Sequence, residues 1–215
     1  CVSFLEENDL LNRSIKIFCG KGNDGGDGLE MARLFISKGF NPNIYIVEMG
    51  SLGSENFQAN LQRLHSISTH IHFLQSKEFF PVIEKNELVI DALLGLGLDR
   101  PLHGLYAELV HHINQHNATV VAIDLPTGMF CDKSSLENTV IKANYTLTFQ
   151  SLKRCFLMAE NALFTGNVSI LNIGLLTEFL KTIHTNTFLI SESIAQTIYK
   201  PRQDFVHKGT CGHAL

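Results

Sequence analysis

Hydrophobic residues along this chain fall either in short continuous runs or in longer stretches where they recur every three or four positions. Short apolar runs bounded by turn residues are typical of buried strands, and the three-to-four spacing is typical of amphipathic helices. The pattern predicts seven strands, at residues 15–19, 43–49, 70–74, 88–94, 119–125, 145–149 and 167–173. It also predicts helices at residues 28–38, about 54–66, about 76–84 and 105–116.

The order of these elements, in which strands alternate with helices, is typical of α/β proteins. The runs at 88–94 and 119–125 are apolar almost throughout, as are parallel strands that are covered on both faces. We therefore expect a three-layer α/β/α sandwich with a Rossmann-like, mostly parallel sheet. At 215 residues, the chain is long enough for one such domain, alone or with a fragment of another.

A glycine-rich run from Gly20 to Gly28 joins the first predicted strand to the first predicted helix. Backbone N–H groups at the start of a helix attract anions such as phosphate. We expect the glycines to supply positive φ angles and to let a ligand come close. The same run contains Asp24 and Asp27, which would repel an anion. Either the ligand is not a bare phosphate, or a cation lies between it and the carboxylates.

Two further acidic residues, Asp91 and Asp124, each come at the end of a β-branched run. Ligands of doubly wound sheets bind beyond the carboxyl ends of the strands, so we expect Asp24, Asp91 and Asp124 to converge there. Asp27 could be a helix N-cap, and Asp91 or Asp124 could cap a following helix, but three converging acids need pairing, protonation or a bridging cation. Carboxylates and the nearby Thr127 hydroxyl are oxygen ligands, which suit a hard cation better than zinc.

Two basic residues and a glycine pattern leave alternatives open. Lys153 and Arg100 follow predicted strands, where each could contact a phosphate or simply be a solvated surface residue. The spacing of the glycines in 20–25, with Glu48 further on, matches the dinucleotide-binding fingerprint. An NAD-dependent oxidoreductase is therefore one candidate, although the chain lacks a second catalytic domain and clear hydride-site residues.

Composition excludes several classes of protein. The net charge of −4, with 45% hydrophobic and 18% charged residues, is typical of a globular chain and gives no reason to expect nucleic-acid binding. No apolar run reaches membrane-spanning length, and no secretory leader opens the chain. Five separated cysteines without a C-x-x-C pair favour reduced thiols. We expect a cytoplasmic protein, with no membrane partner, whose native N-terminus is missing because the chain begins with Cys1.

Three motifs, at residues 22–29, 91–98 and 122–128, together with later strands through Gly174, resemble the YjeF N-terminal domain family of NAD(P)HX epimerases. The resemblance runs from about residue 15 to 175. Members of this family interconvert the R and S forms of hydrated NADH or NADPH (NAD(P)HX) at C6 of the nicotinamide ring. A dehydratase then restores the cofactor. The resemblance implies the same isomerase activity here, without distinguishing NADHX from NADPHX.

The resemblance also implies three sets of site residues. The substrate-binding set is Asn23, Asp24, Gly25, Gly26, Asp27, Gly95, Leu96, Gly97, Leu98, Asp99, Arg100 and Asp124. A potassium ion would be held by Asp24, Asp91 and Thr127. Here Asp24 replaces a usual Asn and Thr127 a usual Ser. Chemistry at C6 needs a general acid/base, for which Asp124 is the first candidate and Lys153 the second.

Residues 191–215 resemble the linker and opening strand of the ribokinase-like NAD(P)HX dehydratase domain. We therefore predict an epimerase domain at 1–190 and the start of a dehydratase domain at 191–215, with an ordinary tail as the alternative. The expected partners are NAD(P)HX, a fused or separate dehydratase and, by the resemblance, a second copy in a homodimer. The rival hypothesis is a non-catalytic scaffold, as in a related domain of an mRNA decapping enhancer, but a scaffold would more readily have lost the acids.

Overall fold

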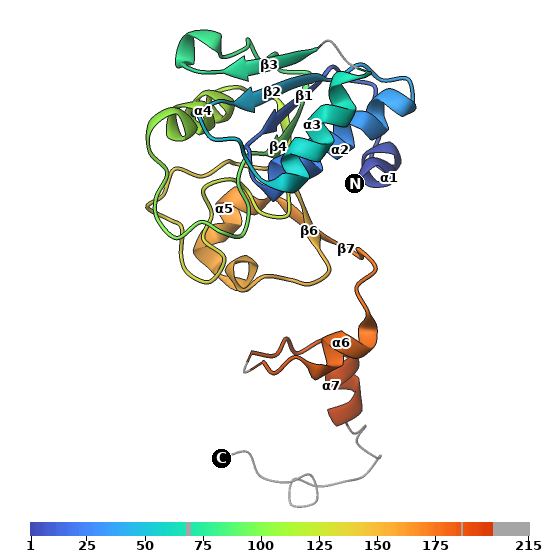
Figure 1. The fold of residues 1–215 in the computed structure, drawn as a ribbon. Helices are drawn as coiled ribbons and strands as arrows, with labels where there is room; N and C mark the ends of the chain where they lie inside the picture. Colours follow the sequence, from blue (N-terminus) through green and yellow to red (C-terminus); the bar gives the residue numbers. More distant parts are fainter. Residues whose placement is uncertain (68–69, 186, 200–215) are drawn as a thin grey trace, which may run out of the picture. The chain divides into compact units, whose positions relative to one another are not determined.

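The computed structural model describes residues 1–67, 70–185 and 187–199. The chain divides into two units, Cys1–Gly174 and Leu175–Leu215. The first unit contains a seven-stranded, fully parallel sheet in the order β3-β2-β1-β4-β5-β6-β7 (Figure 1). Its strands are β1 Ile15–Cys19, β2 Asn43–Val47, β3 Ile71–Leu74, β4 Leu88–Ala92, β5 Thr119–Ile123, β6 Tyr145–Phe149 and β7 Asn167–Leu171. All seven predicted strands are confirmed; β2, β4, β5 and β7 each end two residues earlier than predicted.

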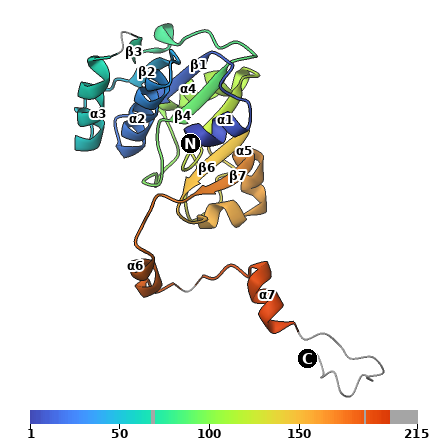
Figure 2. The ribbon, with the colours of Figure 1, turned by 90° about the vertical axis from the view of Figure 1, so that its right-hand side faces the viewer.

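Helices cover both faces of this sheet (Figures 1 and 2). The helices of the first unit are α1 Val2–Glu7, α2 Asn23–Ser37, α3 Glu55–His65, α4 Gly104–Gln115 and α5 Ala162–Thr165. Leu29 of α2 and Phe57 of α3 pack with Ile17 on one face of the sheet. Leu109 of α4 packs with Phe18 on the other face, because successive strand residues point to opposite sides. The predicted three-layer α/β/α sandwich is confirmed.

The helix boundaries show where the sequence pattern was misleading. Helices α3 and α4 begin and end within one residue of their predicted bounds. The helix predicted at 76–84 is wrong, because only a 3₁₀ turn, Lys77–Phe79, forms there. Pro81 lies in the middle of that stretch, and proline has no N–H to donate within a helix. The pattern missed the short helices α1 and α5.

Helix α2 begins at Asn23, five residues before its predicted start, so most of the glycine run is helical. None of these glycines has a positive φ, and our expectation on that point is wrong. They are needed for close packing instead. A Cβ on Gly25 would lie 1.8 Å from the carbonyl oxygen of Gly20, and one on Gly28 would lie 2.7 Å from Cβ of Ala92. The glycines let the first two turns of α2 pack directly against β1 and β4.

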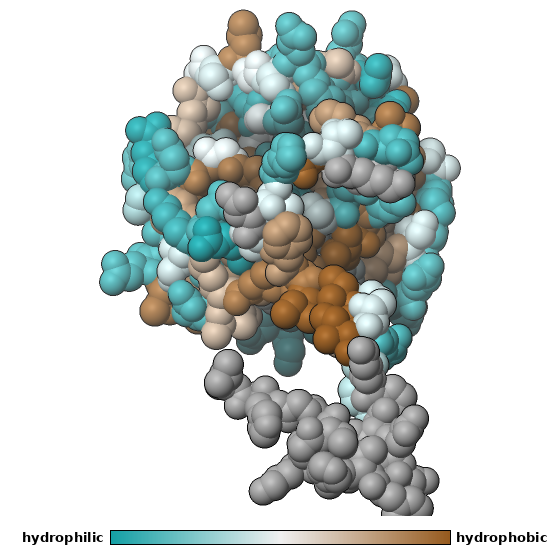
Figure 3. All heavy atoms as spheres, turned by 90° about the horizontal axis from the view of Figure 1, so that it is seen from below, coloured by the Kyte–Doolittle hydropathy of each residue, from teal (hydrophilic) through white to brown (hydrophobic). Residues whose placement is uncertain are grey.

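The second unit contains two short helices, α6 Thr177–Thr182 and α7 Glu192–Ile198. The sequence pattern gave no helix at 191–199, but Ser191 caps α7 there by accepting the N–H of Ile194. No residue of α7 is buried. The rest of the predicted dehydratase segment, residues 200–215, lies outside the described residues. Apolar side chains are gathered on part of the face drawn in Figure 3. No helix in the described part of the chain is long and apolar enough to cross a membrane.

Candidate functional site

Asp91, the fourth residue of β4, is almost completely buried and is tied to the loop that follows β5. The Thr127 hydroxyl donates to Oδ1 of Asp91 at 2.7 Å, and the Thr127 N–H donates to Oδ2 at 2.8 Å. The N–H of Leu93 adds a third hydrogen bond, at 3.3 Å. Burial nevertheless raises the pKa of Asp91 to about 6, because desolvation of the carboxylate outweighs these donors.

Asp24 lies in the first turn of α2, directly against the loop that follows β4. A Cβ on Gly95 would lie only 2.0 Å from Oδ1 of Asp24, so a side chain at this position would displace the carboxylate. Burial raises the pKa of Asp24, and a hydrogen bond from the Gly95 N–H acts in the opposite direction. The charge of Asp24 also contributes to the raised pKa of Asp91, so the two carboxylates lie within electrostatic reach.

Asp124 follows β5 directly and is buried beside β6. Its Oδ1 atom accepts hydrogen bonds from the Thr148 hydroxyl at 3.1 Å, the Phe149 N–H at 2.9 Å and the Lys153 ammonium at 2.5 Å. Its backbone has a φ of 63°, in the left-handed region that residues other than glycine rarely adopt. The structure thus brings the two predicted catalytic candidates, Asp124 and Lys153, into one buried ion pair.

Asp27 completes the cluster from α2, one helical turn after Asp24. Burial, followed by the charges of Asp24 and Asp124, raises the pKa of Asp27 to about 6. The carboxyl edge of the sheet therefore gathers four interacting carboxylates: Asp24, Asp27, Asp91 and Asp124. Among the described residues, a cation pairs with only one of them, since Lys153 contacts Asp124.

The remaining predicted substrate residues lie around this edge. Asn23 is exposed at the first position of α2, and Gly26 is buried, with Asn56 close enough to exclude a Cβ. The loop after β4 exposes Leu96, Gly97, Asp99 and Arg100, and it half-buries Leu98. Arg100 lies beside Asp99, with 3.7 Å between Nε and Oδ1, and both side chains are largely exposed.

Glu48, the acid that the dinucleotide fingerprint would place on a ribose, is already engaged by the protein. Its Oε2 accepts a hydrogen bond from the Lys21 ammonium at 2.5 Å, and its Oε1 accepts the Gly50 N–H at 2.8 Å. Both interactions lower the pKa of Glu48. The arrangement gives the oxidoreductase alternative no support, since binding a ribose there would compete with an existing ion pair.

Thr148 is a site residue that sequence reasoning did not single out. It is fully buried in β6, and its hydroxyl lies between Lys153 and Asp124. The available signal was its position, because Thr146 and Thr148 are polar residues on one side of an otherwise apolar strand. Buried hydroxyls need partners, so such a pair indicates a polar neighbour.

The residues predicted to hold potassium fit a hard cation. Their donors are all oxygens, which hard cations prefer. The Thr127 hydroxyl accepts the Leu94 N–H at 3.0 Å and donates to Asp91, which leaves one lone pair free. Among the described residues, Oδ2 of Asp91 accepts a hydrogen bond only from the Thr127 N–H, so it can also accept a further contact. The set contains only two acidic side chains and a hydroxyl, and within the described ranges no group of three or more His, Cys, Asp or Glu side chains that could hold a metal ion is found, so an ion here would need further oxygen ligands.

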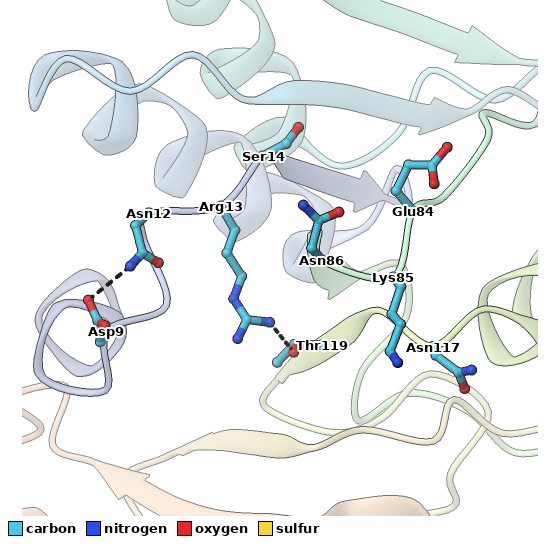
Figure 4. A pocket seen from close by; sticks show the side chains of 9 residues that line it. All are labelled: Asp9, Asn12, Arg13, Ser14, Glu84, Lys85, Asn86, Asn117 and Thr119. Atoms are coloured by element: carbon cyan, nitrogen blue, oxygen red, sulfur yellow. Dashed lines mark hydrogen bonds between the residues drawn. The ribbon is translucent and has the colours of Figure 1, made fainter.

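A hollow of about 840 Å³ lies at the opposite edge of the sheet, where β1, β4 and β5 begin (Figure 4). Its lining is polar throughout and carries two acids and two cations, Asp9, Glu84, Arg13 and Lys85. Arg13 reaches across it to donate to the Thr119 hydroxyl at 2.5 Å (Figure 4). None of the residues predicted for the site lies in this hollow.

Comparison with known proteins agrees with the sequence motifs. The model of a family described as "YjeF-related protein N-terminus" matches residues 1–155. The chain is 34% identical to an NAD(P)H-hydrate epimerase of Rhodopirellula baltica over 170 residues, covering 78% of this chain and 69% of that protein. It is 32% identical to a bifunctional NAD(P)H-hydrate repair enzyme of Coxiella burnetii over 205 residues, covering 94% of this chain.

The chain spans only about two fifths of the length of such bifunctional relatives, 41% of the Coxiella protein and 40% of one from Moorella thermoacetica. The crystal structure of the yeast protein ynu0 has the same fold, with a TM-score of 0.66 at 17% identity. That comparison covers 95% of this chain and 82% of the yeast chain. The family model matches most of the chain, and the three motifs all lie at one edge of the sheet. This protein therefore belongs to the YjeF-related N-terminal family.

Proposed function

We propose that this chain interconverts the R and S forms of hydrated NADH and NADPH at C6 of the nicotinamide ring. The observation that carries this proposal is the carboxylate cluster at the carboxyl edge of the sheet, which three separate motifs of the chain build together. The names of the relatives from Rhodopirellula and Coxiella support the same reaction.

Epimerisation at C6 requires the C6–O bond to break and to form again on the other face of the ring. The lone pair of the neighbouring ring nitrogen forms a C=N bond as the hydroxyl leaves with an added proton, as water. Water then adds to C6 from the other face and loses a proton, so no net proton is consumed. We assign this proton transfer to Asp124, because its Oδ2 accepts no hydrogen bond from the described residues.

We further propose that Asp24, Asp91 and Thr127 hold a potassium ion. The unpaired negative charge at this edge supports the proposal, because a bound cation would reduce the repulsion among the carboxylates. The ion would supply positive charge close to the substrate-binding loops. Comparing potassium, sodium and magnesium dependence in the native chain and in Asp24→Asn tests the assignment, because removing one formal charge should weaken cation binding. Unchanged ion dependence would contradict it.

The length of the matches supports a dehydratase partner fused to this domain. The epimerase of Rhodopirellula aligns over 170 residues, whereas the bifunctional proteins of Coxiella and Moorella align over 205 and 213 residues. The longer alignments with the bifunctional proteins are expected if the C-terminal part of this chain corresponds to their linker into a second domain. We also expect a homodimer, which analytical ultracentrifugation would test.

The experiment that tests the proposed activity starts from the pure R form of NADHX, incubated with the chain in potassium buffer. Chromatographic separation of the two forms measures the rate of approach to equilibrium, with the spontaneous rate as background. We expect acceleration by the native chain and a loss of about 100-fold or more in Asp124→Asn. Circular dichroism would show that the variant still folds. A folded native chain that gives no acceleration would contradict the proposal and favour the scaffold hypothesis.

A further inference from the structure

Every proton of the Lys153 ammonium is already used within the protein. Nζ donates to Oδ1 of Asp124 at 2.5 Å, to the Thr148 hydroxyl at 2.8 Å and to the carbonyl oxygen of Phe149 at 2.9 Å. An ammonium has three protons and no lone pair. Lys153 therefore has no proton left to donate to a substrate unless one of these hydrogen bonds breaks.

Thr148 connects this ammonium to Asp124. Its hydroxyl accepts from Lys153 and donates its single proton to Oδ1 of Asp124, at 3.1 Å. The side chain is fully buried, so water cannot take over either hydrogen bond without a rearrangement. Together with the Phe149 N–H, these donors bring three hydrogen bonds to Oδ1, and none of the described residues donates to Oδ2.

The backbone of Asp124 is held by the same strand. Its N–H donates to the Leu147 carbonyl oxygen of β6 at 2.9 Å, and its φ of 63° places it in the left-handed region. Such a conformation is strained in a residue other than glycine and persists only where the surroundings enforce it. Strand β6 therefore fixes both the backbone and one carboxylate oxygen of Asp124.

We propose that Thr148 and Lys153 are positioning residues, which hold Oδ1 of Asp124 so that Oδ2 alone exchanges a proton with the substrate. The proposal rests on the proposed epimerase activity and assigns Lys153 no proton transfer of its own. Oδ2 must first take up a proton from solvent; it gives this proton to the hydroxyl that leaves C6 and regains one from the water that adds, so the carboxyl group ends the cycle as it began. The other titratable groups that interact with Asp124 are Asp24, Asp27 and Cys131, and none of them donates a hydrogen bond to it.

The chain offers a matched control for Thr148. Thr146 lies two residues earlier in β6, is equally buried, and donates its hydroxyl to the Thr165 carbonyl oxygen at 2.7 Å, away from Asp124. Thr146→Val and Thr148→Val remove the same atom from the same strand. A merely structural role predicts similar effects for both variants, whereas positioning predicts an effect on kcat only at residue 148.

We expect Thr148→Val to lower kcat for NADHX epimerisation about tenfold with little change in KM, since one hydrogen bond to the reacting carboxylate is lost. Thr148→Ser should restore most of the activity, because serine keeps the hydroxyl, and Thr146→Val should leave kcat unchanged. Equal losses in the two valine variants, or no rescue by serine, would overturn the proposal.

Lys153→Gln separates positioning from proton transfer. The Gln amide can still donate to Asp124 but cannot act as an acid, so we expect a partial loss of activity, smaller than that of Asp124→Asn. A loss as complete as that of Asp124→Asn would overturn the assignment for Lys153.

A second test, by NMR, does not depend on epimerase activity. The ¹⁵N NMR signal of the Lys153 ammonium should be protected from water exchange in the native chain and should exchange faster in Thr148→Val than in Thr146→Val. If the native chain shows no epimerase activity, the proposed function fails. The NMR comparison then decides the positioning assignment separately, and equal exchange in the two variants would overturn it.

Discussion

At the amino end of the sheet, the Lys16 ammonium and the Glu87 carboxylate form a buried ion pair between β1 and the residue before β4. At the carboxyl end, four carboxylates interact, and the described residues pair only Asp124 with a cation. The hollow at the amino end is also balanced, with two acids and two cations in its lining.

The difference indicates what each end does. Matched buried charges satisfy one another, so the amino end is complete without a ligand. Carboxylates that are buried or half-buried without a cation, as Asp24, Asp27 and Asp91 are among the described residues, cost free energy unless they are protonated or meet a cation, and perturbed groups of this kind concentrate at functional sites. This difference supports the proposed cation and substrate site at the carboxyl end, which would be maintained at the expense of stability in their absence.

The largest effect on stability should come from breaking the pair at the amino end. Lys16→Met leaves the Glu87 carboxylate buried without its partner, which typically costs about 3–5 kcal/mol of unfolding free energy. Urea unfolding measures the loss, and the activity per folded molecule should not change. Lys38→Met is the control, because Lys38 and Glu6 form an exposed pair worth about 1 kcal/mol at most. Similar losses of unfolding free energy in both variants would contradict the expected difference between buried and exposed ion pairs.

Next in size is a pH effect at the carboxyl end. The pKa values of Asp27 and Asp91 are raised to about 6, so between pH 4 and pH 6 the folded chain binds more protons than the unfolded chain. These groups therefore lower the stability as the pH rises through that range, by at most about 3 kcal/mol for fully buried Asp91.

The midpoint of urea unfolding at pH 4.5 and at pH 7.5 measures this pH effect. The buffer should contain tetramethylammonium as its only cation. Potassium should restore part of the loss at pH 7.5 and have little effect at pH 4.5. Equal potassium effects at both pH values would contradict a cation site at these carboxylates.

A smaller loss of stability should follow when a methyl group is added in the first turns of α2, which are closely packed. Gly25→Ala puts Cβ 1.8 Å from the backbone oxygen of Gly20, so the helix must shift, at a cost of about 1–3 kcal/mol. Gly97→Ala is the matched control, because nothing lies within 4 Å of its Cβ. Thermal unfolding compares the two, and an unchanged midpoint in Gly25→Ala would show that α2 can move away at little cost.

The smallest effect on stability should come from Arg100→Gln. Arg100 and Asp99 are largely exposed and 3.7 Å apart, so stability should change by about 0.5 kcal/mol at most. If the loop after β4 binds the phosphates of the substrate, KM for NADHX should rise several-fold while kcat stays the same. An unchanged KM would remove Arg100 from the substrate site.

Sequence reasoning succeeded where one physical signal dominates. All seven strands were placed, and the signal was clearest for β4 and β5, whose runs are apolar almost throughout because a parallel strand buried on both faces admits few polar residues. The same reasoning placed Asp91 and Asp124 at one edge, because parallel strands all end on the same side. The start of α2 was misjudged because glycine is a poor helix former, and only packing against β1 and β4 explains its place inside a helix.

The sequence by itself determined the parallel α/β fold, the motifs at three strand ends and the excess of acid among them, since periodicity, order and charge are properties of the chain. Only the tertiary structure decided how those acids are held: Asp91 is tied to Thr127, and Asp124 has a left-handed backbone and a carboxylate that accepts hydrogen bonds from the described residues through Oδ1. It also decided that Thr148 belongs to the site. These features depend on hydrogen bonds between residues far apart in the sequence, whose geometry is set only when β4, β5 and β6 pair in the sheet.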